Sequence, residues 1–268
     1  WVGLKCVHDT IESSASITVS PELSSLNLPD DFEMPPGGLN IRNKSGLGVY
    51  QEIIEQEWRL HNQKLPAVHA FVRANAIDRI MMGGADAHTG IVTTGKSYLD
   101  VRRAFLELGI DEAKARLLGL RLYKVGMPWP LEPQGVFDFS RGLEKIIVIE
   151  EKRGLIEEQL KSILYGMQSA PSIVGKTDEQ GSTLFGVAGR LEASEIALEI
   201  SRQLRKEAID GELRNRIQRI EKIVEKDEQI SSPMIRTAYF CAGCPHNSST
   251  TVPEGSRALA GIGCHFMA

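Results

Sequence analysis

The stretch that decides the fold is Gly90-Ile91-Val92-Thr93-Thr94-Gly95. Its β-branched residues form a short run between two glycines, which is typical of a strand buried on both faces that ends in a tight turn. Ser97 follows the turn and can cap a helix that continues to about Leu108. A strand that leads directly into a helix is the building unit of a parallel α/β sheet.

The same pattern recurs further along the chain, where short apolar runs alternate with amphipathic segments. Strands are predicted near residues 90–94, 121–125, 145–149 and 171–175, and helices near 97–108, 134–142 and 155–165. Strands that alternate with helices predict an α/β fold with a parallel sheet, which we expect to occupy residues 84–205.

Composition and charge exclude several classes of protein. The 268 residues include 31 lysines and arginines against 35 aspartates and glutamates, and the net charge of −4 excludes a nucleic-acid binder that works by neutralising phosphates. A hydrophobic content of 42% with 25% charged residues is ordinary for a folded domain and excludes a disordered chain. No apolar run approaches the ~20 residues that a membrane-spanning helix needs. We therefore expect neither a nucleic acid nor a membrane as partner.

The flanking segments predict helices and a linker. Residues 49–62 and 64–75 have the pattern of two polar-faced helices, with Pro66 in the first turn of the second. Residues 193–205 and 211–226 are highly charged, with acidic and basic residues nearly balanced, which is typical of solvated helices in a linker. The chain begins at residue 1 without an initiator methionine, so we expect an internal fragment of a longer polypeptide.

Three of the four cysteines lie within the last 28 residues, which indicates a metal or redox site in a reducing compartment, the cytoplasm. Cys241-Ala242-Gly243-Cys244 is a C-x-x-C turn, and Cys264 follows it. A structural zinc site would use these three cysteines with His246 or His265. An iron–sulfur cluster would need a fourth cysteine from elsewhere. A thioredoxin-like redox pair and free buried thiols are further alternatives, and spacing alone does not choose between zinc and a cluster.

Taken together, these stretches resemble the fused, single-chain indolepyruvate:ferredoxin oxidoreductases, within the 2-oxoacid:ferredoxin oxidoreductase superfamily. The similarity extends over nearly the whole chain, apart from the charged linker and the residues around 166–192. The runs that carry it are Trp1–Cys6, Asp9–Ser16, Met34–Arg42, Gly90–Tyr98, Leu122–Pro133, Phe240–His246 and Gly261–His265.

The resemblance implies an arrangement of domains, with a transketolase C-terminal-like parallel-sheet domain flanked by parts of two thiamine-diphosphate-binding domains. The implied order is the tail of the pyrimidine-binding domain (1–40), connecting helices (41–83), the transketolase C-terminal-like domain (84–205), a charged helical linker (206–232) and the start of the diphosphate-binding domain (233–268).

The resemblance also implies a reaction. Such enzymes decarboxylate a 2-oxo acid oxidatively to an acyl-CoA, here indolepyruvate or another arylpyruvate, and pass the electrons to ferredoxin. The implied cofactors are thiamine diphosphate, Mg²⁺ and a 4Fe-4S cluster, and the implied partners are coenzyme A, ferredoxin and further copies of the chain in a homo-oligomer. The alternative is a non-catalytic α/β assembly module with a C-terminal zinc-binding knob.

By position, the resemblance assigns roles to the last segment of the chain. The expected cluster ligands are Cys241, Cys244 and Cys264, with the fourth ligand outside this sequence. The residues expected to line the thiamine pocket are His246, Gly261, Ile262 and Gly263. The acidic residue that activates thiamine and the Mg²⁺ ligands are expected outside this chain, so no catalytic residue is assigned within it.

Overall fold

A five-stranded sheet organises the first of the two units into which the chain divides, residues 1–224 and 225–268. The computed structural model describes residues 14, 16–20, 25–39, 48–229, 239–259, 261, 263 and 264. Of the runs that carry the resemblance, the parts that lie outside the described residues are Trp1–Cys6, Asp9–Ser13, Ala15, Asn40–Arg42, Ile262 and His265.

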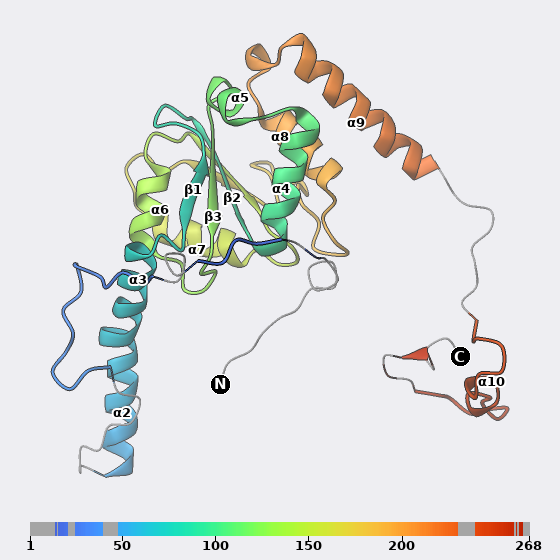
Figure 1. Ribbon diagram of the computed structural model, residues 1–268, viewed down its shortest axis with the longest axis horizontal. Helices are drawn as coiled ribbons and strands as arrows, with labels where there is room; N and C mark the ends of the chain where they lie inside the picture. Colours follow the sequence, from blue (N-terminus) through green and yellow to red (C-terminus); the bar gives the residue numbers. More distant parts are fainter. Residues whose placement is uncertain are drawn as a thin grey trace. The chain divides into compact units, whose positions relative to one another are not determined.

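The sheet has the strand order β1-β3-β2-β4-β5 (Figure 1). Its strands are β1 (Arg79–Met82), β2 (Thr89–Thr94), β3 (Leu120–Val125), β4 (Lys145–Ile149) and β5 (Ser172–Val174). Strands β3, β2, β4 and β5 are parallel, while β1 pairs antiparallel with β3 at one edge. The four predicted strands and the α/β class are confirmed. The edge strand β1 is an addition that the sequence pattern did not predict, because its four residues are half-exposed and neither alternate nor form a buried run.

Helices surround the sheet and extend from it. In the described residues they are α2 (Val49–Arg59), the π-helix η2 (Leu60–Lys64), α3 (Leu65–Ala74), α4 (Gly95–Leu108), α5 (Glu112–Leu117), α6 (Pro133–Ser140), α7 (Leu155–Leu164), α8 (Ala193–Gln203), the 3₁₀-helix η3 (Lys206–Ala208), α9 (Gly211–Gln229) and α10 (His246–Ser249). The two helices predicted at 49–62 and 64–75 are present, joined by η2. Ser97 does not cap α4, because the helix begins two residues earlier and Ser97 is buried in its first turn.

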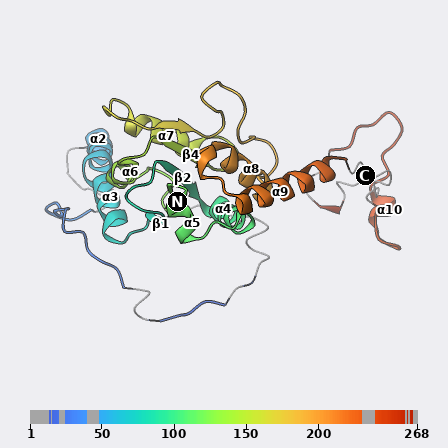
Figure 2. The ribbon, with the colours of Figure 1, turned by 90° about the horizontal axis from the view of Figure 1, so that it is seen from above.

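The central strands are buried on both faces, as the sequence predicts. Ile91 and Ile147 are adjacent in register and contribute to an apolar core with α4 and α8. Val92 and Val148 are also adjacent in register and contribute to a second core with α6 and α7. Figures 1 and 2 show α4 and α8 beside one another and α6 on the other side of the sheet. The domain is therefore a three-layered α/β fold.

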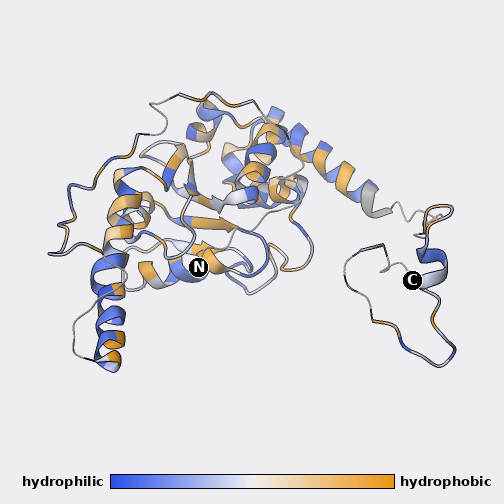
Figure 3. Cartoon of the chain, turned by 60° about the horizontal axis from the view of Figure 1, so that its bottom comes forward, coloured by the Kyte–Doolittle hydropathy of each residue, from blue (hydrophilic) through white to orange (hydrophobic). Residues whose placement is uncertain are grey.

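Helix α9 contributes to the first core. Figure 3 shows hydrophilic and hydrophobic residues alternating along it. Leu213 and Ile220 are buried, and Ile217 and Val224 pack against the same core. The expectation of a solvated helix at 211–226 is therefore wrong for one face of α9. The core includes residues on both sides of the predicted range 84–205, since Met82 of β1 also packs against it.

Arg121 of β3 connects several loops of the domain. Its side chain is only 5% exposed. The guanidinium donates hydrogen bonds to the backbone carbonyls of Gly84, Ala85, Phe139 and Arg141, at distances of 2.6–3.1 Å. Burial lowers the pKa of this arginine. Because buried carbonyls need partners, one side chain holds the turn before β2 and the end of α6 together.

Replacing Arg121 tests this role. We expect Arg121→Met to lower the free energy of unfolding by about 2–4 kcal/mol, because the buried carbonyl of Phe139 and the partly buried carbonyls of the neighbouring turns lose their donor. Urea denaturation followed by far-UV circular dichroism measures the change. Arg116→Met is the matched control, because Arg116 is 62% exposed and pairs with Glu112 on its own helix. We expect this substitution to cost at most about 0.5 kcal/mol. Equal losses in the two variants would contradict the assignment.

Candidate functional site

The C-x-x-C segment forms a tight turn in the second unit. The amide of Cys244 donates to the carbonyl of Cys241 at 3.0 Å, which closes the turn. Gly243 has a φ of 77°, a left-handed conformation that glycine adopts without the strain of a side chain. The side chain of Asn247 donates to the Cys241 carbonyl at 3.2 Å and links the turn to α10. Glycine at position 243 therefore allows the turn between the two cysteines to adopt this conformation.

His246 lies against this turn from the first position of α10. Its Nδ1 atom is 3.1 Å from the sulfur of Cys244. The imidazole stacks on the ring of Phe240, with the ring centroids 5.4 Å apart. The hydroxyl of Thr250 donates to the His246 carbonyl at 2.5 Å. The structure thus brings together a thiol and an imidazole that the zinc alternative places in one site and the family resemblance places in two different sites.

The third cysteine is not gathered with the other two. Cys241 and Cys264 are exposed, Cys244 is half-buried, and all three are free thiols. Gly261 and Gly263 lie beside Cys264 outside any helix or strand. Across the described part of the chain, no three cysteine, histidine or acidic side chains form a group that could hold a metal ion. Thiolates and imidazoles suit iron and zinc chemically, but their described placement does not fit a cluster or a closed zinc site.

A second place where polar groups gather is the carboxyl edge of the sheet, where ligands of open α/β sheets bind. Glu150 directly follows β4 and is buried. Its carboxylate accepts hydrogen bonds from the first amides of α7, those of Leu155, Ile156 and Glu157, at 2.9–3.0 Å. Burial raises the pKa of Glu150, and the bonds from the amides oppose this rise. Glu150 is therefore the cap of α7.

The neighbouring charges at this edge form ion pairs. Lys96 lies 2.9 Å from Asp100 and 3.6 Å from Glu151. Lys176 contacts the Glu150 carbonyl, and burial lowers the pKa of this lysine. The sequence analysis did not select these residues, although two acidic residues directly after a buried strand are a readable signal. The ion pairs of Lys96 and the contact of Lys176 with the Glu150 carbonyl indicate that these charged residues position helices.

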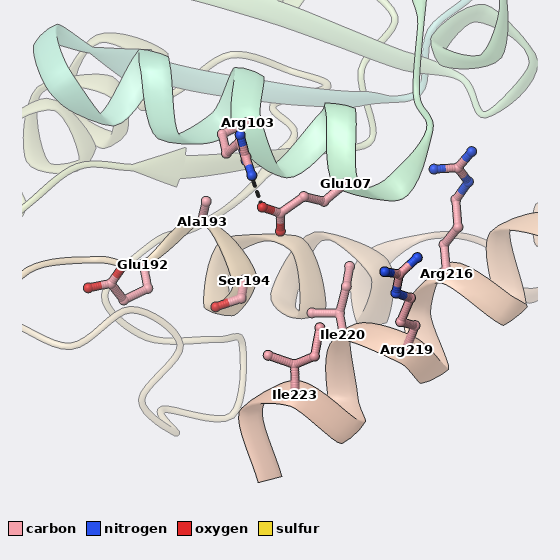
Figure 4. Close-up of a pocket in the computed structure, with 9 residues that line it drawn as sticks. All are labelled: Arg103, Glu107, Glu192, Ala193, Ser194, Arg216, Arg219, Ile220 and Ile223. Carbon is pink, nitrogen blue, oxygen red and sulfur yellow. Dashed lines mark hydrogen bonds and ion pairs between the residues drawn. The ribbon is translucent and has the colours of Figure 1, made fainter. Parts of the chain in front are cut away.

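A groove of 640 Å³ lies between α4, the start of α8 and α9 (Figure 4). Its charged lining residues are Arg103, Glu107, Glu192, Arg216 and Arg219. Arg103 pairs with Glu107 at 2.8 Å, and Arg216 pairs with Glu212 at 3.0 Å. Among the described residues, no histidine, cysteine or buried carboxylate lines this groove. Its carboxylates, those of Glu107 and Glu192, are not buried and pair with arginines, so they lack the burial that prepares a carboxyl group for acid–base catalysis.

The raised pKa of Glu150 predicts a pH dependence. The folded-state pKa of this carboxyl lies above its ordinary value of 4.5, so the folded state holds the proton more tightly than the unfolded state does. The free energy of unfolding therefore falls as the pH rises from the ordinary pKa through the folded-state pKa. We expect the unfolding free energy of the wild type to fall relative to Glu150→Gln between pH 4 and pH 7. Urea denaturation at both pH values measures it, with Glu158→Gln on α7 as the exposed control. If wild type and Glu150→Gln differed in unfolding free energy by the same amount at both pH values, the raised pKa of Glu150 would be contradicted.

Comparison with known proteins gives a family. A family model described as an indolepyruvate oxidoreductase domain matches residues 79–227. The IorA subunit of indolepyruvate oxidoreductase from Thermococcus kodakarensis is 29% identical over 191 residues, which cover 69% of this chain and 26% of that protein. The IorA subunit from Pyrococcus horikoshii is 27% identical over 168 residues, which cover 62% of this chain and 23% of that protein. The chain spans about a quarter of the length of these curated relatives.

Solved structures give weaker likenesses. A 2-oxoglutarate:ferredoxin oxidoreductase from Magnetococcus marinus, with 2-oxoglutarate, coenzyme A and succinyl-CoA bound, aligns with a TM-score of 0.42 and 16% identity, over 61% of this chain and 25% of that one. A split-gene transketolase, an inactive β4 tetramer, aligns with a TM-score of 0.33 and 16% identity, over 47% of this chain and 40% of that one.

Two findings complete the comparison. In the described ranges, no helix is long and apolar enough to cross a membrane. The match to the family model extends over more than half of the 268 residues and includes all five strands and the helices packed on them. This chain therefore belongs to the indolepyruvate oxidoreductase domain family.

Proposed function

We propose that the chain is part of a 2-oxoacid:ferredoxin oxidoreductase that acts on indolepyruvate or another arylpyruvate. The observation that carries the proposal is the family match at residues 79–227. The similarity to IorA subunits over about two thirds of the chain supports it. The zinc-binding assembly module is not supported by the matched relatives, and the described residues do not form a closed zinc site.

The proposed reaction is an oxidative decarboxylation. A 2-oxo acid and coenzyme A give an acyl-CoA, carbon dioxide and a proton, and two electrons pass to two ferredoxins. Thiamine diphosphate with Mg²⁺, when bound, supplies the carbanion chemistry. In this proposal the enzyme acts in the cytoplasm as a homo-oligomer, and the groups that activate thiamine come from outside this chain.

Within that enzyme, residues 84–205 have an architectural role as the transketolase C-terminal-like domain. The support is that charged groups in and near its core are engaged: Arg121 binds carbonyls, Glu150 caps α7, and the half-buried Lys96 pairs with acids. Residues 1–40 and 233–268 contribute the edges of the two thiamine-binding domains. Residues 41–83 and 206–232 connect these parts.

The proposed cofactor contacts lie in the cysteine segment. Cys241, Cys244 and Cys264 are cluster ligands together with a fourth cysteine outside this sequence, and what supports this is that thiolates are the ligands that iron–sulfur clusters use. His246, Gly261, Ile262 and Gly263 line the thiamine pocket. The stacking of His246 on Phe240 supports a positioned imidazole.

Two substitutions in the whole enzyme test these roles. We expect Cys241→Ser to lower iron content and ferredoxin reduction while thiamine binding stays near normal, because serine is a poor ligand for iron. We expect His246→Ala to weaken thiamine binding or turnover while iron content stays near normal. Iron, acid-labile sulfide and bound thiamine are measured on anaerobically purified protein, with Cys6→Ser as the matched control.

The outcomes of these substitutions separate the alternatives. Unchanged iron and unchanged ferredoxin reduction in Cys241→Ser would remove the cluster role of the turn. Stoichiometric zinc in place of iron and sulfide in the wild-type enzyme would support the assembly module and contradict the proposal.

The proposal also predicts the behaviour of the 268-residue chain alone. We expect no decarboxylation of indolepyruvate by this chain, because the groups that activate thiamine are assigned elsewhere. The assay measures carbon dioxide release from carboxyl-labelled substrate with thiamine diphosphate, Mg²⁺, coenzyme A and ferredoxin present. Turnover above the protein-free rate would show that the activating carboxylate lies within these residues.

A further inference from the structure

Three basic side chains gather on the α4 side of the sheet without acidic partners. They are Arg79 of β1, Lys124 of β3 and Arg102 of α4. Within the described part of the chain, none of the three forms an ion pair. Most other basic side chains of the domain have such partners, so this basic patch is a distinct feature.

Strand register places two of these charges directly opposite one another. Arg79 and Lys124 are partners in the antiparallel pairing of β1 with β3. Leu120 and Leu122 contribute to the core beneath α4, and side chains alternate along a strand, so Lys124 lies on the same face as these leucines. Like charges directly opposite on neighbouring strands destabilise a sheet. The fold therefore keeps two cations together at an electrostatic cost.

Tyr98 holds the patch together. Its ring is buried in the first turns of α4. The ammonium nitrogen of Lys124 lies 4.8 Å from the ring centroid, and the guanidinium carbon of Arg102 lies 6.0 Å from it. Arg102 also donates a hydrogen bond to the Tyr98 hydroxyl at 3.1 Å. Cation–π attraction of this kind orients both cations against one ring, which gives the patch a fixed geometry.

The nearest acidic groups in the sequence are engaged elsewhere. Asp100 pairs with Lys96. The carboxylate of Asp78 accepts hydrogen bonds from the amides of Gly126 and Met127, at 2.7 and 2.9 Å. The three positive charges of the patch are therefore not compensated by these carboxylates.

We propose that Arg79, Arg102 and Lys124 form a binding site for the phosphoryl groups of a soluble phosphorylated ligand. Two guanidinium groups offer paired donors that match phosphate oxygens, and a lysine adds a point charge. Lys124 of β3 and Arg102 of α4 both contact the Tyr98 ring, and Arg79 lies opposite Lys124 in the sheet. This close grouping favours a compact, multiply charged group over an extended acidic surface. The site goes beyond the proposed function, which assigns no residue of this patch.

Charge reversal at Arg79 separates binding from folding. We expect Arg79→Glu to weaken the binding of inorganic pyrophosphate at least about tenfold, because a carboxylate replaces a phosphate-binding guanidinium. The melting temperature should stay the same or rise, because glutamate opposite Lys124 replaces a repulsion with an attraction. Isothermal titration calorimetry at low ionic strength measures the affinity, and differential scanning fluorimetry measures the melting temperature.

Arg141→Glu is the matched control, because Arg141 follows α6 on the other side of the sheet and undergoes the same charge change. We expect its pyrophosphate affinity to change less than about twofold. The proposal is overturned if the wild-type protein does not bind pyrophosphate. That result would favour an acidic protein as the partner of this surface. The proposal is equally overturned if the two variants lose the same affinity, which would indicate a general charge effect.

A competition experiment identifies the source of the phosphoryl group. Displacement of pyrophosphate by coenzyme A would support the site and name the phosphates of coenzyme A as its ligand. Binding of pyrophosphate that coenzyme A does not displace would support a site for another phosphorylated molecule. Because neither readout depends on turnover, the patch and the proposed function are tested separately.

Discussion

The structure depends on one constraint, which is that β2 has a hydrogen-bonded parallel neighbour on each side and a helical layer on each face. No side chain of its central residues can reach water, so the strand is composed of glycine, threonine and β-branched apolar residues. Gly90 shows how tight the packing is: a Cβ there would lie 2.6 Å from side-chain atoms of Phe139 and Leu143. The close approach of α6 to the sheet therefore requires glycine at this position.

Because β2 is enclosed on all sides, charged side chains occur outside this strand, where they are paired or hydrogen-bonded. Arg121 satisfies backbone carbonyls, and Glu150 satisfies the first amides of α7. These arrangements rigidify the loops. They support the proposed role of this domain as a scaffold within an enzyme, since the described residues form no metal site. The basic patch around Tyr98 differs, because within the described part of the chain none of its three cations forms an ion pair, and Arg102 and Lys124 contact a neutral tyrosine instead.

The central strands could be predicted because burial on both faces leaves a clear record in their residue types, and Ile146–Ile149 is an example. Strand β1 could not, because it is held by pairing with β3 and has no pattern of its own. The buried side of α9 had a readable signal, since Leu213, Ile217, Ile220 and Val224 recur at helical spacing, but balanced charges obscured it. Cysteine spacing revealed the turn. The contact of Cys244 with His246 depends on the turn's conformation, and the patch depends on strand register; neither is visible in a linear sequence.

The central claim is that this chain is part of an enzyme that oxidises indolepyruvate with ferredoxin as acceptor. The most direct measurement is the reduction of ferredoxin by the whole polypeptide, purified anaerobically with its iron and thiamine, in the presence of indolepyruvate, pyruvate or 2-oxoglutarate. The account predicts reduction that starts on addition of indolepyruvate, requires coenzyme A and yields the corresponding acyl-CoA. An iron- and thiamine-loaded enzyme that reduces no ferredoxin with indolepyruvate or any other arylpyruvate would contradict it.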